Sequence, residues 1–485
     1  MTMAEAAFST IEQTVQTTDY QEVFNLQLKH QYVLARTKAA ERKEKLQRLH
    51  DIILRDRKEI EAALWQDLHK SPTETVISEI GAVCGEIRHT MRNLSSWMQS
   101  KQVSTPLLAF GSSSEIRYEP KGVCLMLSPW NFPFNLTLVP LVSAVAAGNC
   151  VIIKPSEFAP KSAAMMKKIV EECFPPEEVS LFEGDVSVAK ALLELPFQHV
   201  FFTGSPQIGK SVMQAAAQHL ASVTLELGGK SPVIIDESAD LDVAAAKVAW
   251  VKCMNAGQLC TAPDYVLVPE HLHDRFVEKV TACIRRFYGE TMEARRASPD
   301  LCRIIHERHF DRVKALLDDA AQRDATVAFG GQTIRAEKYI DPTVLTRVPD
   351  DARIWEEEIF GPLLPVRTYR SLEEAIQYVN DKPKALALYI FSRKNKHTET
   401  ILRETRGGGV TVNDCSTHFY NLELPFGGAN NSGMGKCHGE FGFREFSNAR
   451  AVLRQARLFP TTNLLLPPYG SRIAKVILEA LAKWF

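Results

Sequence analysis

The sequence predicts an α/β protein whose strands form parallel sheets, and three observations support this class. At 485 residues, the chain is long enough for about three domains. Apolar residues make up 45% of it and charged residues 24%, as is usual in globular proteins. From Gly122 onward, short apolar runs alternate with longer amphipathic stretches, which is typical of βαβ units. The runs that predict strands are residues 123–127, 150–153, 199–202, 223–225, 233–235 and 265–268.

The N-terminal part of the chain is predicted to be helical. Residues 27–100 carry apolar side chains at helical spacing, for example at Leu46, Leu49, Ile52 and Ile53. The residues before them show neither the basic nor the apolar segment of a secretory signal. No apolar stretch approaches the roughly 18 to 20 residues that span a membrane. We therefore expect a cytoplasmic protein.

The C-terminal segment, residues 471–485, is predicted to form an amphipathic helix. Its apolar side chains recur at helical spacing, and most of its charged side chains fall elsewhere. Three roles stay open: docking on its own protein, covering a substrate entrance, or peripheral contact with a membrane. The apolar face comprises Ile473, Val476, Ile477, Ala480, Leu481 and Trp484.

Charge and cysteine usage exclude some classes of function. Lys and Arg number 57 against 58 Asp and Glu, and no run of five like charges occurs, so we expect no nucleic-acid partner. The ten cysteines form no C-x-x-C pair, which indicates reduced thiols in a cytosolic enzyme and no metal site.

One motif fits a nucleotide. Residues 204–211, GSPQIGKS, match the pattern G-x-x-x-x-G-K-[ST] between a predicted strand and an Ala-rich helix. Glycines there let backbone N–H groups approach phosphate at a helix N-terminus. Asp236 and Glu237 end an apolar run, where they either bind the magnesium of a P-loop NTPase or simply finish a strand. An NTPase that depends on Lys210 is therefore one hypothesis.

Three further residues have the chemistry of covalent catalysis. Cys260 follows a break at Gly257 after a helical run, so substrate can reach its thiol. Glu226 ends a predicted strand just before two glycines, where a carboxylate can act as a general base. Asn131 lies between prolines and aromatic residues, and a rigid amide suits an oxyanion hole. Each alone also has a structural interpretation.

Together, these residues belong to a series of motifs that resembles NAD(P)-dependent aldehyde dehydrogenases, in that family's order. The sequence is most similar to the class 3 branch, which contains fatty and aromatic aldehyde dehydrogenases. The motifs are PWNFP (129–133), IKPSE (153–157), FTGS (202–205), LELGGKSP (225–232), GQLCTAPDY (257–265), EEEIFGPLLPV (356–366) and LPFGGANNSGMG (424–435), with DLHK (67–70) and MGKCHG (434–439) typical of the branch. The NTPase hypothesis explains only one of them, and a catalytically silent family member is a third alternative.

The resemblance implies an aldehyde dehydrogenase fold and a mechanism. The fold is a Rossmann-like cofactor lobe, a second α/β catalytic lobe and a small β oligomerisation arm. Cys260 would add to the aldehyde as a thiohemiacetal, whose oxyanion Asn131 and the Cys260 backbone N–H would hold. Glu226 would then activate water to hydrolyse the thioester.

The resemblance also assigns a cofactor site for NAD, with NADP as an alternative. Glu157 would accept hydrogen bonds from the adenosine ribose and repel a 2′-phosphate, whereas Lys154 would soften that repulsion. The pyrophosphate would lie near Gly204, Ser205 and Gly209. Glu358 would bind the nicotinamide ribose, with Phe360 beside the ring.

The resemblance indicates the substrate class and the oligomeric state less directly than the mechanism. Trp250 and Met254, four residues apart on the helix before Cys260, either line an apolar tunnel or belong to the core. His418 and Phe419 would border the substrate mouth, which suits medium- to long-chain or aromatic aldehydes. Class 3 relatives are homodimers, so a homodimer is expected.

The resemblance divides the chain into six segments. They are 1–103, N-terminal helices of the cofactor lobe; 104–118, first part of the oligomerisation arm; 119–227, Rossmann-like domain; 228–425, catalytic domain; 426–470, return to cofactor lobe and arm; and 471–485, C-terminal helix.

Overall fold

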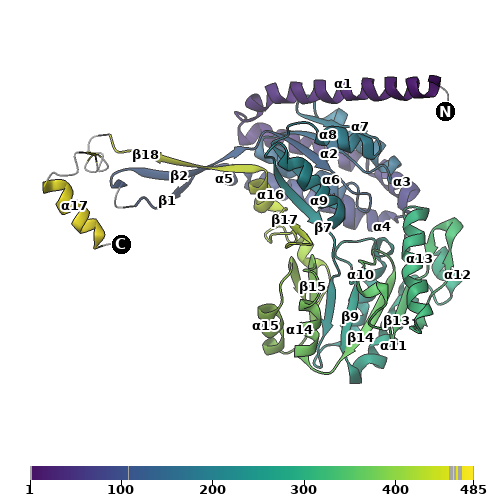
Figure 1. The fold of residues 1–485 in the computed structure, drawn as a ribbon. Coiled ribbons are helices and arrows are strands. Elements are labelled where there is room, and N and C mark those ends of the chain that lie inside the picture. The colour runs from purple at the N-terminus through teal and green to yellow at the C-terminus, as the bar shows by residue number, and fades with distance from the viewer. Residues whose placement is uncertain (1–2, 107–108, 458–462, 464–465, 468–471, 484–485) are drawn as a thin grey trace.

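The computed structural model of the chain describes residues 3–106, 109–457, 463, 466–467 and 472–483. Two large sheets, of six and seven strands, lie one above the other, and a three-stranded sheet extends sideways as an arm (Figure 1). The predicted α/β class with parallel sheets is confirmed, and each of the six predicted runs forms a strand.

The six-stranded sheet has the order β17-β7-β6-β3-β4-β5, with β17 antiparallel and the other strands parallel. Successive strands run outward from β3 through β4 to β5, and the chain then returns to β6 on the other side of β3. A ligand binds at the carboxyl ends of the strands where such an order reverses, here β3 and β6. The strands are β3 (Val123–Leu127), β4 (Cys150–Lys154), β5 (Val179–Leu181), β6 (His199–Gly204), β7 (Ser222–Leu227) and β17 (Gly433–Met434).

Helices cover both faces of this sheet because its strands are apolar on both sides. Cys124 and Met126 of β3 pack on one side against a first group of helices, and Val123 and Leu125 pack on the other side against a second group. The first group is α2 (Ala39–Arg55), α3 (Arg57–Leu68), α5 (Gly81–Trp97), α6 (Asn135–Ala147), α7 (Pro160–Cys173) and α16 (Gly439–Glu445), and the second is α1 (Met3–Leu34), α8 (Val186–Leu193) and α9 (Pro206–Ala217). Short α4 (Pro72–Thr75) and a π-helical turn, Val76–Ile80, lead into α5.

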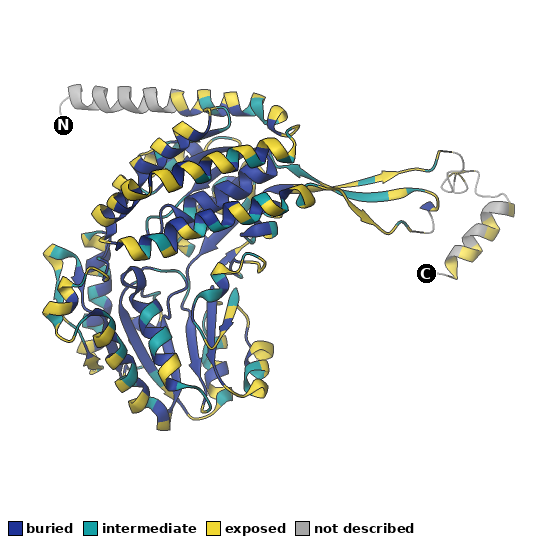
Figure 2. Cartoon of the chain, turned by 180° about the vertical axis from the view of Figure 1, so that it is seen from behind, coloured by how far each residue is buried: buried dark blue, intermediate teal, exposed yellow. Residues whose placement is uncertain are grey.

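The seven-stranded sheet has the order β10-β13-β14-β9-β8-β15-β16, and only β10 is antiparallel to its neighbour. Its strands are β8 (Pro232–Ile235), β9 (Tyr265–Pro269), β10 (Thr326–Phe329), β13 (Thr343–Thr346), β14 (Leu363–Tyr369), β15 (Ala387–Phe391) and β16 (Gly409–Val412), and a separate hairpin pairs β11 (Thr333–Ile334) with β12 (Tyr339–Ile340). The helices around it are α10 (Leu241–Cys253), α11 (His273–Tyr288), α12 (Met292–Ala297), α13 (Glu307–Gln322), α14 (Leu372–Asn380) and α15 (Asn395–Glu404). The inner strands β8, β9, β13 and β15 are buried throughout, as Figure 2 shows in dark blue, whereas the edge strands β10 and β16 are largely exposed.

The arm is an antiparallel sheet of β1 (Lys101–Val103), β2 (Ser113–Pro120) and β18 (Ser447–Arg454), with β2 in the centre. It projects from the body, and most of its side chains are exposed or half-buried (Figure 2). Residues 107–108 and 458–462 of the expected arm lie outside the described residues.

The C-terminal segment forms the helix α17 (Arg472–Ala482), but the expectation that it docks on its own body or covers its own substrate entrance is wrong. Strand β18 runs away from the body to the tip of the arm, so α17 lies beyond that tip in both views (Figures 1 and 2). Its residue Val476 is 65% exposed. Trp484 lies outside the described residues. Among the helices of the described ranges, none is long and apolar enough to cross a membrane.

Candidate active site

The predicted site lies between the two large sheets. Residues that end β6 or follow β3 line it from the six-stranded sheet, and residues that precede β9 and β14 line it from the seven-stranded sheet. They enclose a cavity of about 510 Å³. Its lining includes seven of the predicted residues, namely Asn131, Gly204, Ser205, Glu226, Cys260, Glu358 and Phe360.

A sharp turn of the backbone brings Cys260 into this cavity. Helix α10 ends at Cys253, four residues before the break that we predicted at Gly257. Residues 255–257 then adopt left-handed conformations, with φ of 50°, 53° and 73°. Gly257 has no room for a side chain, since a Cβ atom would lie 2.5 Å from the carbonyl carbon of Gly361. The partly exposed thiol thus leaves the helix axis and borders the cavity.

Buried amides fix Asn131 beside the loop that carries this thiol. The backbone carbonyl of Gln258 accepts hydrogen bonds from Nδ2 of Asn131 and Nδ2 of Asn255, both at 3.1 Å. The buried Gln258 side chain makes three further hydrogen bonds to backbone groups. Because Gln258 lies two residues before Cys260, the Asn131 amide is fixed close to the nucleophile without any reorganisation.

A buried ion pair supports Asn131 from behind. Nζ of Lys70 lies 2.6 Å from a carboxylate oxygen of Glu79, and both side chains are 0% exposed. The same ammonium donates to the backbone carbonyl of Asn131 at 3.2 Å, and Nδ2 of Asn255 donates to that carbonyl at 2.8 Å. Our sequence reasoning missed this pair, although Lys70 ends the DLHK motif at 67–70.

The electrostatics of this cavity favour neutral forms of its acidic side chains. Burial, together with the carboxylates of Glu358 and Glu226, raises the pKa of the Cys260 thiol to about 12. Burial also raises the pKa of Glu226 to about 8, and neither of its carboxylate oxygens has a hydrogen-bond partner among the described residues. The pKa of Glu358 rises to about 8 because of burial and the nearby carboxylate of Asp264. Near pH 8, Glu226 can thus exchange a proton with its surroundings.

The loop that carries Glu358 and Phe360 is clamped by residues that the sequence did not reveal. Nε2 of His309 lies 2.8 Å from the carbonyl oxygen of Phe360, and Arg312 donates to the carbonyl of Glu358 at 3.0 Å. Lys230 donates to two further carbonyls, at positions 354 and 357. Phe360 itself has a φ of 47°, so these contacts hold a strained backbone in place.

Comparison with known proteins decides the family. The aldehyde dehydrogenase family model matches residues 5–452. The chain belongs to the aldehyde dehydrogenase family. It is 44% identical to the putative aldehyde dehydrogenase AldX of Bacillus subtilis, over 90% of this chain and 98% of that one. It is 41% identical to human aldehyde dehydrogenase family 3 member B1, over 94% of this chain and 96% of that one. A substrate-bound structure of Staphylococcus aureus AldH matches with a TM-score of 0.90 and 38% identity, covering 95% of this chain and 99% of that one.

This aldehyde dehydrogenase is NAD(P)-dependent, and the cavity has features that suit a dinucleotide. At Gly204 and Gly228, no side chain covers the backbone on the side of the cavity. A Cβ atom would lie 2.5 Å from the Phe202 ring at Gly204 and 2.6 Å from the Glu358 carboxylate carbon at Gly228. Ser205 caps α9, whose N-terminus therefore faces the cavity.

Lys154 and Glu157 do not line the cavity described above. Lys154 ends β4 beside the end of β3, and its Nζ lies 2.7 Å from a carboxylate oxygen of Glu157. Both therefore lie along the same carboxyl edge of the six-stranded sheet as the cavity.

The P-loop hypothesis is wrong for this aldehyde dehydrogenase. Helix α9 begins at Pro206, so Gly209 and Lys210 lie within the helix and not in a loop around phosphate. Gly209 is buried, and its lack of a side chain allows close packing on Leu227, so it lies away from the cavity where we expected a cofactor contact.

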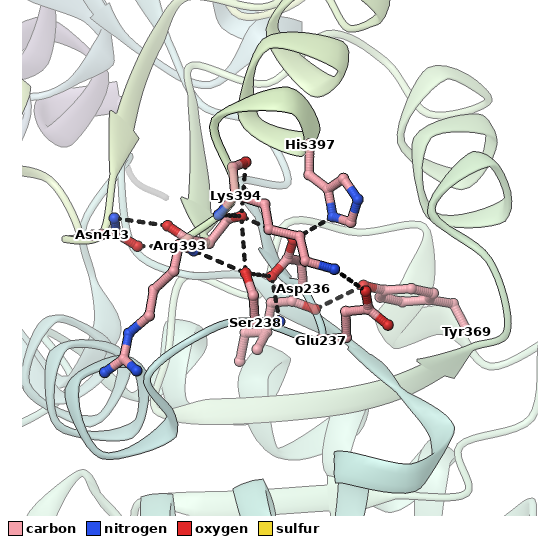
Figure 3. A network of polar contacts seen from close by, with 10 residues as sticks. Asp236, Glu237, Ser238, Tyr369, Arg393, Lys394, His397 and Asn413 are labelled. Carbon is pink, nitrogen blue, oxygen red and sulfur yellow. Dashed lines mark hydrogen bonds and ion pairs between the residues drawn. The ribbon is translucent and has the colours of Figure 1, made fainter.

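The proposed magnesium ligand also lies elsewhere. Asp236 directly follows β8, a strand of the other sheet. It accepts hydrogen bonds from the hydroxyls of Ser238 and Ser392 at 2.6 and 2.8 Å, and a ring nitrogen of His397 lies 2.6 Å away (Figure 3). Asp236 thus connects β8 to the start of α15. This is the structural role that we weighed against magnesium binding.

A second, narrow cavity also borders Cys260. Trp250, Met254 and Phe419 line it as predicted, although Met254 follows α10 and is not part of the helix. His418 does not line it: its ring is buried, with Nδ1 2.8 Å from the Thr411 hydroxyl. The cavity is mainly apolar and has a volume of about 30 Å³.

Proposed function

We propose that this aldehyde dehydrogenase acts through covalent catalysis by Cys260. The observation that supports this most is the meeting of a partly exposed thiol, a carboxylate and a fixed amide in one cavity. An aldehyde has no alkoxide from which hydride can leave until a nucleophile has added to its carbon. Cys260 can provide that nucleophile, because its sulfur borders both the large cavity and the apolar one.

In the first half-reaction, the sulfur of Cys260 bonds to the aldehyde carbon as the thiol loses its proton to solvent water. The carbonyl oxygen gains the negative charge, which the amide N–H of Asn131 and the backbone N–H of Cys260 stabilise. When bound, NAD(P) supplies the acceptor for the hydride that leaves this carbon. The substrate is then held on Cys260 as a thioester.

In the second half-reaction, Glu226 takes a proton from water as the water oxygen attacks the thioester carbon. The carbon–sulfur bond breaks, Glu226 returns that proton to the sulfur of Cys260 and the carboxylic acid leaves. Glu226 suits this role because its carboxylate is buried, makes no hydrogen bond to the described residues and has a pKa near 8.

The cofactor contacts favour NAD but leave NADP acceptable. The Glu157 carboxylate would accept hydrogen bonds from both ribose hydroxyls and repel a 2′-phosphate, whereas Lys154, 2.7 Å away, would reduce that repulsion. Backbone groups at Gly204 and Ser205 would hold the pyrophosphate. Glu358 and Phe360 would hold the nicotinamide end of the cofactor.

The apolar cavity selects the substrate, and we infer medium- to long-chain aliphatic or aromatic aldehydes. Trp250, Met254 and Phe419 surround the approach to Cys260 with apolar surface. A cavity of about 30 Å³ admits an alkyl chain only when side chains turn aside. Met254 suits this movement, because its side chain is unbranched and adaptable.

The arm and α17 suggest an assembly and a location. The arm carries exposed apolar side chains, with Val103 40% and Leu453 53% exposed, and a second copy of the arm would cover them in a homodimer. We place the enzyme in the cytoplasm. The exposed helix α17 makes peripheral contact with membranes there, and sedimentation with anionic vesicles tests this contact.

A nicotinamide absorbance assay tests the function. The purified chain is mixed with NAD or NADP and a series of short aliphatic, long aliphatic and aromatic aldehydes. Reduction should require Cys260 and be lost in Cys260→Ala. The matched control is Cys283→Ala, since Cys283 is the other cysteine of the described chain that is not buried. Retained reduction in Cys260→Ala would remove Cys260 as nucleophile.

A further inference from the structure

A third and smaller cavity lies behind the nucleophile, and the mechanism above does not use it. It has a volume of about 20 Å³ and is bordered by Cys260. Most of its wall is apolar. Four of its lining residues are buried and polar: Thr203 and, with polar atoms that lack a partner among the described residues, the three residues Glu226, Asn135 and His438.

Each of these three side chains has unpartnered polar atoms. Both carboxylate oxygens of Glu226, Oδ1 of Asn135 and Nδ1 of His438 lack a hydrogen-bond partner among the residues that the structure describes. The residues are only 6%, 4% and 3% exposed. Buried polar groups are normally satisfied, so three such residues around one cavity indicate a small polar occupant. A water needs about 10 to 15 Å³ and two to four polar partners, and this cavity supplies both.

The backbone of His438 gives an independent reason to assign it a role. Its φ is 74° and its ψ is 140°, a conformation that favours glycine. The ring is nonetheless held firmly, stacked on Phe426 with centroids 5.1 Å apart and edge-on to Phe419 at 4.6 Å. Burial lowers the pKa of His438 to about 3, so the ring is neutral and has one nitrogen that accepts hydrogen bonds. Residues kept in strained conformations cluster at functional sites.

We propose that this cavity holds the water that hydrolyses the Cys260 thioester, and that His438, together with Asn135, is a positioning residue for it. The inference rests on the proposed function, since it needs the thioester and Glu226 as base. The water donates one hydrogen to the Glu226 carboxylate and the other to Nδ1 of His438 or Oδ1 of Asn135. Its oxygen then bonds to the thioester carbon, Glu226 takes the first proton, and the carbon–sulfur bond breaks. No electron transfer is involved.

Two substitutions of nearly equal shape separate this role from packing. His438→Asn leaves an acceptor close to the position of Nδ1, whereas His438→Leu does not. The full-length variants are acylated with p-nitrophenyl acetate, which needs no hydride acceptor. The burst of p-nitrophenol reports acylation, and the later steady rate reports hydrolysis. Thermal unfolding confirms that both variants fold.

We expect acylation within about twofold of wild type in both variants, and hydrolysis slowed about tenfold or more in His438→Leu only. Hydroxylamine attacks the thioester directly, so it should restore turnover in His438→Leu. Equal hydrolysis in wild type and His438→Leu, or an acylation burst slowed as much as hydrolysis, would overturn the proposal while leaving Cys260 catalysis intact. A wild type that forms no acyl-enzyme would instead overturn the proposed function.

Discussion

The substitution Gly228→Ala tests whether Glu358, which precedes β14 of the seven-stranded sheet, binds the cofactor. The added Cβ atom would lie 2.6 Å from the carboxylate carbon of Glu358, against an ordinary carbon–carbon contact of about 3.5 to 4.0 Å. The carboxylate must therefore move by about 1 Å. Gly228 has no left-handed φ, so alanine causes no backbone strain. The clash falls on the end of a flexible side chain, and we expect the unfolding temperature to change little.

Displacements of about 1 Å at a reacting centre cost up to about a hundredfold in rate. We expect the KM for NAD to rise at least about tenfold in Gly228→Ala, with a lower kcat. Initial rates at varied NAD measure both constants. Gly85→Ala is the matched control, because no atom lies within 4 Å of its added Cβ. An unchanged KM and kcat in Gly228→Ala would refute the assigned contact of Glu358 with the cofactor.

Three further predictions concern the base, the buried pair and the C-terminal helix. Because Glu226 must be ionised to act as a base and its pKa is about 8, thioester hydrolysis should rise on the order of 50-fold between pH 6 and 8, and a flat profile would contradict this. Lys70→Met leaves the Glu79 carboxylate buried without its cationic partner, although the Asn135 N–H still donates to it, so unfolding free energy should fall by about 3 to 5 kcal/mol, and kcat should fall more than KM changes. Lys70→Met/Glu79→Gln should recover much of the stability in urea unfolding; no recovery would argue against the pair. Removing residues 471–485 should weaken sedimentation with anionic vesicles, because α17 lies exposed beyond the arm, and unchanged sedimentation would exclude a membrane contact through this segment.

The spacing of apolar residues predicted the fold, because a strand that is covered on both faces is apolar at every position of its own sequence. The runs at 123–127 and 150–153 are apolar on both faces, as strands covered by helices on both sides must be. The end of α10 was misplaced because left-handed residues at 255–257 follow Cys253 before Gly257 is reached. The P-loop match failed because eight residues do not specify whether a lysine lies in a loop or, like Lys210, inside a helix.

Long-range contacts explain what the sequence did not reveal about the site. Motifs indicated Cys260, Glu226 and Asn131, and the structure brings them to one cavity. The support of Asn131 by Lys70 spans 61 residues, and no local pattern predicts that distance. The resemblance placed His418 at the substrate mouth, yet its neighbours Phe419 and Tyr420 line the apolar cavity and His418 does not.

The direct test of the central claim is to find the thioester on Cys260. Glu226→Gln is mixed with NAD and an aldehyde, quenched in acid and examined by intact and peptide mass spectrometry. We predict one acyl group per chain, on the peptide that contains Cys260, with reduced cofactor formed in equal amount. An unmodified Cys260 after cofactor reduction, or an acyl group on another residue, would contradict covalent catalysis by this thiol.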